Sequence, residues 1–162
     1  MTERFATGKS PYHFTDSGLD YVYLSGIAYF KCRNGHRLAD IPAVEQLMEL
    51  IARDVVEKPA ALTGPEIKFL RKRLSKKAVD FAKEIGLEPE TLSRIENSKR
   101  QAKESTDKLI RLYYAVSSGD PVLLKELQTA LVDLLTRWTE TQSKKKLMAK
   151  VTDNAWETEA VA

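Results

Sequence analysis

The pattern of hydrophobic and polar residues divides this chain after about its first third. Residues 10–32, SPYHFTDSGLDYVYLSGIAYFKC, are rich in aromatic and β-branched residues and are interrupted by two Ser-Gly pairs, which predicts two or three short antiparallel strands joined by turns. In residues 43–57 the apolar residues recur at steps of three and four, as in a helix that packs on a sheet. The segment EKPAALTGP then interrupts the pattern, so we place a domain boundary near residues 58–62.

The chain after this boundary has the spacing of helices. Thr63 and Glu66 have the spacing of a capping box and predict a helix that ends near Arg73. Ser75 is expected to cap a second helix, which ends at Gly86 because glycine readily adopts the left-handed conformation that closes a helix. The residues expected to face the core from this second helix are Ala78, Val79, Ala82 and Ile85.

A third helix follows the second after a very short turn. Pro89 suits its first turn, and Leu92 and Ile95 are expected to face the core. A helix, a short turn containing glycine and a second short helix form the helix-turn-helix arrangement, in which the second helix stands out from the surface. We therefore predict an α+β protein with a small antiparallel sheet and one helix in residues 1–60, and a helix-turn-helix domain in residues 61–118.

Two further helices complete the prediction. The stretch ESTDKLIRLYYAV is expected to cover the first three helices with Leu109, Ile110, Leu112, Tyr113 and Val116. Residues 119–145 contain a strongly amphipathic helix, whose stripe could pack on the bundle or pair with its copy in another chain. This stripe consists of Leu123, Leu127, Leu131, Leu134 and Trp138. We expect residues 146–162 to form a disordered tail.

Composition indicates a folded protein without membrane segments. The 162 residues are 43% hydrophobic, enough for a core, and no apolar run approaches the roughly 18 residues needed to cross a bilayer. The start lacks the pattern of a signal peptide, and the single cysteine, Cys32, fits a reducing compartment, so we expect a cytoplasmic location. The formal net charge of +3 is too small to identify a partner, which leaves the distribution of charge to decide.

The third helix of this second domain carries the residues suited to reading DNA. Those that point away from its apolar face are Glu90, Thr91, Ser93 and Arg94. Arg94 is the strongest candidate, because a guanidinium can form two parallel hydrogen bonds with guanine, worth on the order of 1–3 kcal/mol of discrimination. Residues near this helix in the sequence are expected to contact phosphates. They are Arg73, Lys76, Lys77, Asn97, Lys99 and Arg100. On charge alone, a solvated helix surface is the slightly better explanation of these basic residues.

An enzyme finds little support in the sequence. There is no nucleophile motif and no phosphate-binding glycine loop, and we expect no catalytic residue and no cofactor. The carboxylates of the helical region have the spacing of an ordinary helix surface. They are Glu84, Glu88, Glu90 and Glu96.

The segment KKAVDFAKEIGLEPETLSRIENSKR resembles the DNA-binding core of the phage-repressor and XRE class, through Ala82, Gly86, Ser93, Arg94, Glu96, Asn97 and Lys99. Together with YHFTDSGLDYVYLSGIAYFKC and LTGPEIKFLRK, it resembles the MqsA or YgiT-type antitoxins, over about residues 10–116. The resemblance implies a homodimer that binds double-stranded DNA at a palindromic operator, with one such helix in each major groove. It also implies an N-terminal domain that binds a toxin protein.

The chain departs from this family at its zinc site. The family holds zinc with two Cys-x-x-Cys pairs, whereas here Cys32 remains with Gly35 at the second position. Structural zinc needs four ligands, and His13, Cys32 and His36 supply three, so we expect no metal. Aromatic packing against the helix at 43–57 must then hold the domain together. The aromatic residues are Tyr12, Phe14, Tyr21, Tyr23, Tyr29 and Phe30.

The resulting hypothesis is a sequence-specific DNA-binding transcriptional repressor, the autoregulating antitoxin of a type II toxin-antitoxin system. Two alternatives remain open. One is a phage, plasmid or mobile-element regulator without a toxin, and the other is a protein-interaction module that uses the helix-turn-helix as a scaffold.

Overall fold

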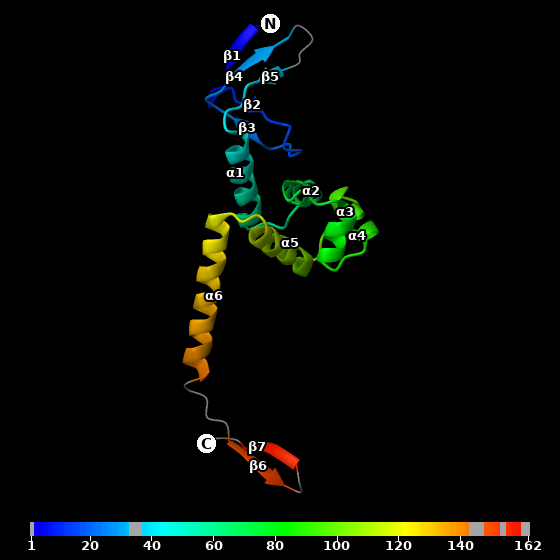
Figure 1. Cartoon of the computed structure of the whole chain (residues 1–162), viewed down its shortest axis with the longest axis vertical. Coiled ribbons are helices and arrows are strands. Elements are labelled where there is room, and N and C mark those ends of the chain that lie inside the picture. Colours follow the sequence, from blue (N-terminus) through cyan, green and yellow to red (C-terminus); the bar gives the residue numbers. More distant parts are fainter. Residues whose placement is uncertain (1, 33–36, 143–147, 153–154, 160–162) are drawn as a thin grey trace. The chain divides into compact units, whose positions relative to one another are not determined.

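The computed structural model describes residues 2–32, 37–142, 148–152 and 155–159 (Figure 1). The chain combines small antiparallel sheets with six helices among these residues, which confirms the predicted α+β class. It divides into two compact units, Met1–Asp120 and Pro121–Ala162, and each is described by itself. The first unit contains both the predicted N-terminal domain and the predicted helix-turn-helix domain.

The N-terminal domain contains more strands than the sequence predicts. Strands β1 (Thr2–Phe5), β4 (Ala28–Lys31) and β5 (Arg37–Ala39) form an antiparallel sheet in the order β1-β4-β5. Strands β2 (Tyr12–His13) and β3 (Tyr23–Leu24) form a separate antiparallel pair. The three strands within residues 10–32 agree with the prediction, and β1 and β5 lie outside the predicted range.

The buried side chains of this domain come from the strand region and from helix α1 (Val44–Glu57), which also contacts α5. Phe14 and Tyr29 are buried, as are Ile51 and Val55 of α1. The expected aromatic core is wrong for three residues, because their side chains are exposed. They are Tyr21, Tyr23 and Phe30. Phe30 follows the buried Tyr29 on β4, and successive side chains of a strand point to opposite faces.

Four helices form the second domain (Figure 1). They are α2 (Gly64–Arg73), α3 (Ala78–Glu84), α4 (Pro89–Glu96) and α5 (Glu104–Ser117). The predicted capping box is present: the Thr63 side chain accepts from the third helical N–H, and the Glu66 carboxylate accepts from the Thr63 N–H at 2.6 Å. Because the capping box at Thr63 and the turn at Gly86 lie where the sequence predicts them, the order and bounds of these helices agree closely with the prediction.

Two expectations for the start of α3 are wrong. Ser75 does not cap this helix; it has φ +54°, and Lys77 is the residue that precedes the first turn. The N–H groups of Ser75 and Lys76 donate to the carbonyls of Lys72 and Arg71, so Ser75 closes α2 instead. Val79 is exposed, and Phe81 occupies the core.

Helix α5 is rotated relative to the prediction. Its buried residues are Asp107, Ile110, Tyr114 and Ala115. Three of the residues expected to cover the other helices are exposed instead. They are Leu109, Leu112 and Val116. The physical reason is that Asp107 and Arg111 make hydrogen bonds to backbone groups of the preceding segments, which turns their face of the helix inward.

The second unit contains helix α6 (Pro121–Gln142) and strands β6 (Met148–Thr152) and β7 (Ala155–Glu159). The two strands pair antiparallel, with Val151 opposite Trp156, where the sequence analysis expects a disordered tail. The pairing is consistent with the β-branched and aromatic residues in these segments. Within the part of the chain that the structure describes, no helix is both long enough and apolar enough to cross a membrane.

Candidate nucleic-acid interface

The turn between α3 and α4 sets the direction of the predicted reading helix. Gly86 has φ +69°, and its N–H donates to the carbonyl of Lys83 at 3.2 Å. The N–H of Leu87 donates to the carbonyl of Ala82 at 2.8 Å. This pair of bonds closes a helix in the Schellman pattern, which requires the left-handed conformation that glycine adopts without strain. Pro89 then occupies the first turn of α4, as predicted.

One side of α4 is buried, and a buried ion pair holds its C-terminal end. Leu92 and Ile95 lie in the core, as predicted. Arg71 of α2 donates from Nε to Glu96 Oε1 at 2.6 Å and from Nη2 to Glu96 Oε2 at 2.8 Å. Hydrogen bonding to Glu96 raises the pKa of Arg71 above its ordinary value. The expectation that Glu96 lies on the helix surface is therefore wrong, because this pairing brings it inside.

Gly64 allows α2 to approach the end of α4 closely. A Cβ atom at this position would lie 2.2 Å from the carbonyl oxygen of Ile95 and 2.9 Å from that of Glu96. No side chain fits there without displacing backbone. Neither this contact nor the pairing of Arg71 with Glu96 is predicted by the local sequence pattern. The signal available for the first was a glycine directly after the capping residue Thr63.

The other side of α4 presents the predicted base-reading residues. Glu90, Ser93 and Arg94 are exposed, and Thr91 is half-buried. Arg94 Nη2 donates to Glu90 Oε1 at 2.6 Å, and the Arg94 side chain is 59% exposed. Such an exposed pair contributes only about 0.3–0.5 kcal/mol, so a stronger acceptor can replace Glu90 easily. The structure thus gathers all four residues on or beside one accessible face.

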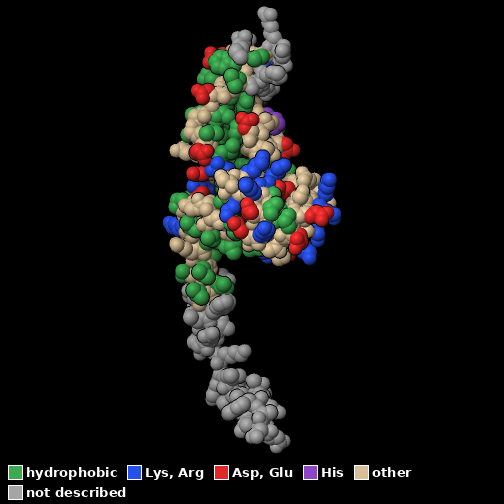
Figure 2. All heavy atoms as spheres, turned by 45° about the vertical axis from the view of Figure 1, so that its right-hand side comes forward, with side chains coloured by type: hydrophobic (Ala, Val, Ile, Leu, Met, Phe, Trp, Pro, Cys, Tyr) green, Lys and Arg blue, Asp and Glu red, His purple; other side chains and the backbone are tan. Residues whose placement is uncertain are grey.

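The segment after α4 adds exposed basic residues. Ser98 has φ +57°, and the N–H groups of Lys99 and Arg100 donate to the carbonyl of Arg94 at 2.8 and 3.2 Å. The side chains of Lys99 and Arg100 are exposed. Asn97 is exposed too, and its Nδ2 donates to the carbonyl of Ser93 at 2.8 Å. Figure 2 shows Lys and Arg side chains gathered over the helical region, interspersed with Asp and Glu.

The basic residues before α4 are less available than the sequence suggests. Lys77 is exposed at the start of α3, whereas Lys76 Nζ lies 2.7 Å from Glu84 Oε1. The hydrogen bond from Lys76 lowers the pKa of Glu84, and a second bond from the Tyr113 hydroxyl acts in the same direction.

Arg73 does not lie with the reading helix. Both of its Nη atoms donate to Glu45 Oε2 of α1 at 3.1 Å. Burial raises the pKa of Tyr114 in α5, and the charge of Arg73 partly offsets this effect. Its position in the sequence puts Arg73 among the expected phosphate contacts. In the structure, however, the Arg73 side chain extends from α2 toward Glu45 of α1.

A buried carboxylate joins the N-terminal domain to the start of α2. Glu66 is 2% exposed and accepts from Lys58 Nζ at 2.6 and 2.8 Å and from the Tyr21 hydroxyl at 2.7 Å. Burial alone would raise the pKa of Glu66, but the hydrogen bonds from Lys58, Thr63 and Tyr21 outweigh it, and its pKa lies below the ordinary value. Partial burial of the Tyr21 side chain, followed by the bond to Glu66, raises the pKa of Tyr21.

The residues considered for zinc have other surroundings. His13 Nε2 lies 2.8 Å from the carbonyl oxygen of Asp20, and its ring stacks on Tyr23 at 4.8 Å. Cys32 is half-buried, and His36 lies outside the described residues. Among the residues that the structure describes, no group of three His, Cys, Asp or Glu side chains could hold a metal ion.

Comparisons with protein-family models, with curated proteins and with solved structures gave no match.

Proposed function

We propose that this chain is a sequence-specific DNA-binding transcriptional repressor that acts as a homodimer on a palindromic operator. The observation that carries the proposal is the presentation of α4. Its buried side is fixed by Leu92, Ile95 and the pairing of Glu96 with Arg71, while its other side offers Glu90, Ser93 and Arg94 to a partner. A rigid helix with exposed polar residues suits the major groove of B-DNA, which is wide enough to admit an α-helix.

The residues around α4 supply the charge that a DNA backbone requires. Lys77, Lys99 and Arg100 are exposed on segments that lie directly before α3 and directly after α4. In this proposal they contact phosphates, and Asn97 adds an amide donor. Lys76 contributes after exchanging Glu84 for a phosphate, and Arg73 is left out because it pairs with Glu45.

The test is selection of bound duplexes from random-sequence DNA, followed by affinity measurements with variants. An inverted repeat should be recovered. Arg94→Ala should weaken operator binding by about 1–3 kcal/mol while leaving non-specific DNA affinity nearly intact. Lys99→Ala should weaken binding to all DNA alike. It should also reduce the slope of log affinity against log salt concentration by about one. Lys9→Ala, an exposed lysine of the N-terminal domain, is the matched control.

Two results would contradict the proposal. If folded protein at low salt enriches no sequence, the helix-turn-helix serves as a scaffold for protein contacts. If Arg94→Ala weakens specific and non-specific binding equally, Arg94 is not a base-reading residue.

We further propose that the repressor is an antitoxin whose N-terminal domain binds a toxin. In β1-β4-β5, Phe30 lies opposite both Glu3 and Leu38, and Phe5 is two residues along β1 from Glu3. Because cross-strand partners project from one face, Phe5, Phe30 and Leu38 share it. All three are exposed, and an exposed apolar patch favours a protein partner.

This step has its own test. The product of the adjacent gene, expressed alone, should arrest growth, and coexpression of this chain should relieve the arrest. Leu38→Asp should abolish the relief without changing operator affinity. If the adjacent gene product is harmless, the regulator without a toxin becomes the better interpretation, and the DNA-binding proposal is unaffected.

A further inference from the structure

Helix α6 carries a regular apolar seam. Its positions are separated by steps of three, four, three and four residues. They are Leu124, Leu127, Leu131, Leu134 and Trp138. This alternation is the heptad spacing of the first and fourth positions in a coiled coil, which keeps one seam facing a partner helix. The stripe expected from the sequence begins at Leu123. In the helix Leu123 lies beside the seam, and Leu124 is the first residue of the seam.

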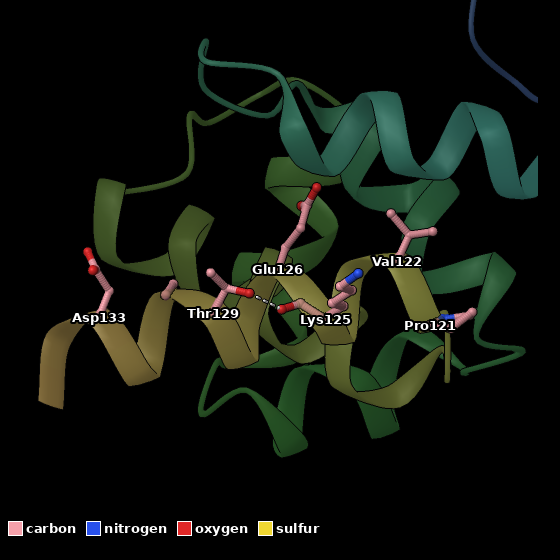
Figure 3. Close-up of a pocket in the computed structure, with 7 residues that line it drawn as sticks. Pro121, Val122, Lys125, Glu126, Thr129 and Asp133 are labelled. Carbon is pink, nitrogen blue, oxygen red and sulfur yellow. Dashed lines mark hydrogen bonds between the residues drawn. The ribbon is translucent and has the colours of Figure 1, made fainter. Parts of the chain in front are cut away.

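The structure leaves the second half of the described seam accessible, whereas Leu124 and Leu127 are half-buried. Leu131 and Leu134 are 56% and 44% exposed, and the neighbouring Leu135 is also exposed. Another side of the helix has a hollow lined by Lys125, Glu126, Thr129 and Asp133 together with the apolar Pro121, Val122 and Ala130 (Figure 3). There the Thr129 hydroxyl donates to the Lys125 carbonyl at 2.9 Å. Exposed leucines in register along one side of an amphipathic helix require a cover.

We infer that a second copy of this chain covers the seam, and that the two α6 helices pair as a short coiled coil. The positions that flank the seam in the sequence are Leu123, Gln128, Ala130, Leu135 and Arg137, of which only Arg137 is charged. Flanking charges are the features by which coiled coils select or reject partners. In a parallel pair the position of Arg137 corresponds to the position of Gln142 in the other copy, so the sequence opposes no like charges along the seam. An identical helix presents the same spacing and completes the knobs-into-holes packing.

This inference deepens the proposed function, because it names the surface that brings two reading helices onto one palindrome. It rests on that proposal for its use in DNA binding, but the association itself is measured without DNA. The exposed face of α5, formed by Leu109, Leu112 and Val116, is the competing surface for a homodimer. The apolar residues of this α5 face extend over only two helical turns, whereas the α6 seam extends over four turns.

The experiment compares the solution mass of the full chain and two charge variants by sedimentation equilibrium over a wide range of concentration. The wild-type protein should have the mass of two chains at high concentration. Leu131→Glu should have the mass of one chain at every concentration tested. Val132→Glu places the same charge one residue away, outside the seam, at a side chain that is 61% exposed, and should remain dimeric. Circular dichroism confirms that each variant is folded.

Three outcomes would overturn the inference. The first is a monomeric wild-type chain at high concentration. The second is a dimer that survives Leu131→Glu, in which case Leu112→Glu should dissociate it and assign the interface to α5. The third is dissociation by Val132→Glu as well, which would mean that the seam does not determine pairing. If the coiled coil is confirmed but DNA selection yields no sequence, the proposed function fails and this inference remains.

Discussion

The buried pair between Arg71 and Glu96 offers the most direct test of how α4 is held. The change is Arg71→Met, which keeps much of the side-chain volume and removes the charge. The side chains of Arg71 and Glu96 are only 10% and 6% exposed, so the Glu96 carboxylate left behind has little access to water. The substitution also removes the bond from Arg71 Nη1 to the Lys76 carbonyl at 2.8 Å.

The magnitude follows from this burial. Removing one partner of a buried pair costs about 3–5 kcal/mol of unfolding free energy, because the other charge stays buried without compensation. For a chain of this size, each kcal/mol lowers Tm by roughly 2–4 °C, so a loss on the order of 10 °C is expected. The double variant Arg71→Met, Glu96→Leu should recover most of this loss, because no uncompensated charge remains. The Lys76 carbonyl still lacks its donor in the double variant.

The assay is urea unfolding followed by circular dichroism, with thermal unfolding as a second measurement. Lys72→Met is the matched control, since it removes a positive charge from the adjacent, exposed position of α2 and should change stability by less than about 0.5 kcal/mol. A loss below about 1 kcal/mol for Arg71→Met would refute the reasoning, because it would mean that water screens the pair. A double variant no more stable than Arg71→Met would mean that packing, and not charge, accounts for the loss.

Two further predictions concern Gly64 and Glu66. Gly64→Ala should lower the unfolding free energy by about 1–3 kcal/mol and weaken DNA binding, because the added Cβ would lie 2.2 Å from the Ile95 carbonyl oxygen and displace α4. Gly8→Ala, with open space around its Cβ, is the control. Equal stability of the two variants would contradict the close approach of α2 to α4. The lowered pKa of Glu66 means that its contribution is fully present above its unfolded pKa of about 4.3 and is lost as the pH falls through the lower folded pKa. The difference in unfolding free energy between wild type and Glu66→Gln should therefore shrink in acid, and a difference independent of pH would contradict this assignment.

The helix-turn-helix could be predicted because its signals are local. The capping box at Thr63, the left-handed Gly86 and the first-turn Pro89 each act within a few residues of the helix end that they determine. The exposed side of α4 follows from the same local pattern, because Leu92 and Ile95 fix which side is buried.

Features that depend on distant pairing could not be predicted in this way. Strand β1 has only the short sequence TERF, and it becomes a strand by pairing with β4 more than twenty residues later. Arg71 looks like one of several basic residues in α2, and only its meeting with Glu96 shows that it is buried. Arg73 likewise falls among the expected phosphate contacts by its position in the sequence, and this position does not show that Glu45 lies beside it.

Helix α5 shows why hydrophobic spacing alone gave the wrong rotation. Apolar residues occur around most of this helix, so steps of three and four fit more than one face. The hydrogen bonds of Asp107 and Arg111 determine which of these faces is buried. Asp107 Oδ1 accepts from the Leu62 N–H at 2.6 Å, and Oδ2 accepts from Arg111 Nε at 2.8 Å.

Arg111 then donates to three carbonyls at the end of α1 and in the linker, at distances between 2.6 and 2.7 Å. They belong to Val56, Lys58 and Ala60. The bonds to Val56 and Lys58 are part-buried and the bond to Ala60 is exposed, and a hydrogen bond from a charged donor contributes at most about 1.5–3 kcal/mol. These bonds draw the face containing Asp107 and Arg111 inward, bury Ile110 and Tyr114 with it, and leave Leu109 and Leu112 outside. Carbonyls at a helix end and in the linker after it can therefore determine which leucines a neighbouring helix exposes to a partner.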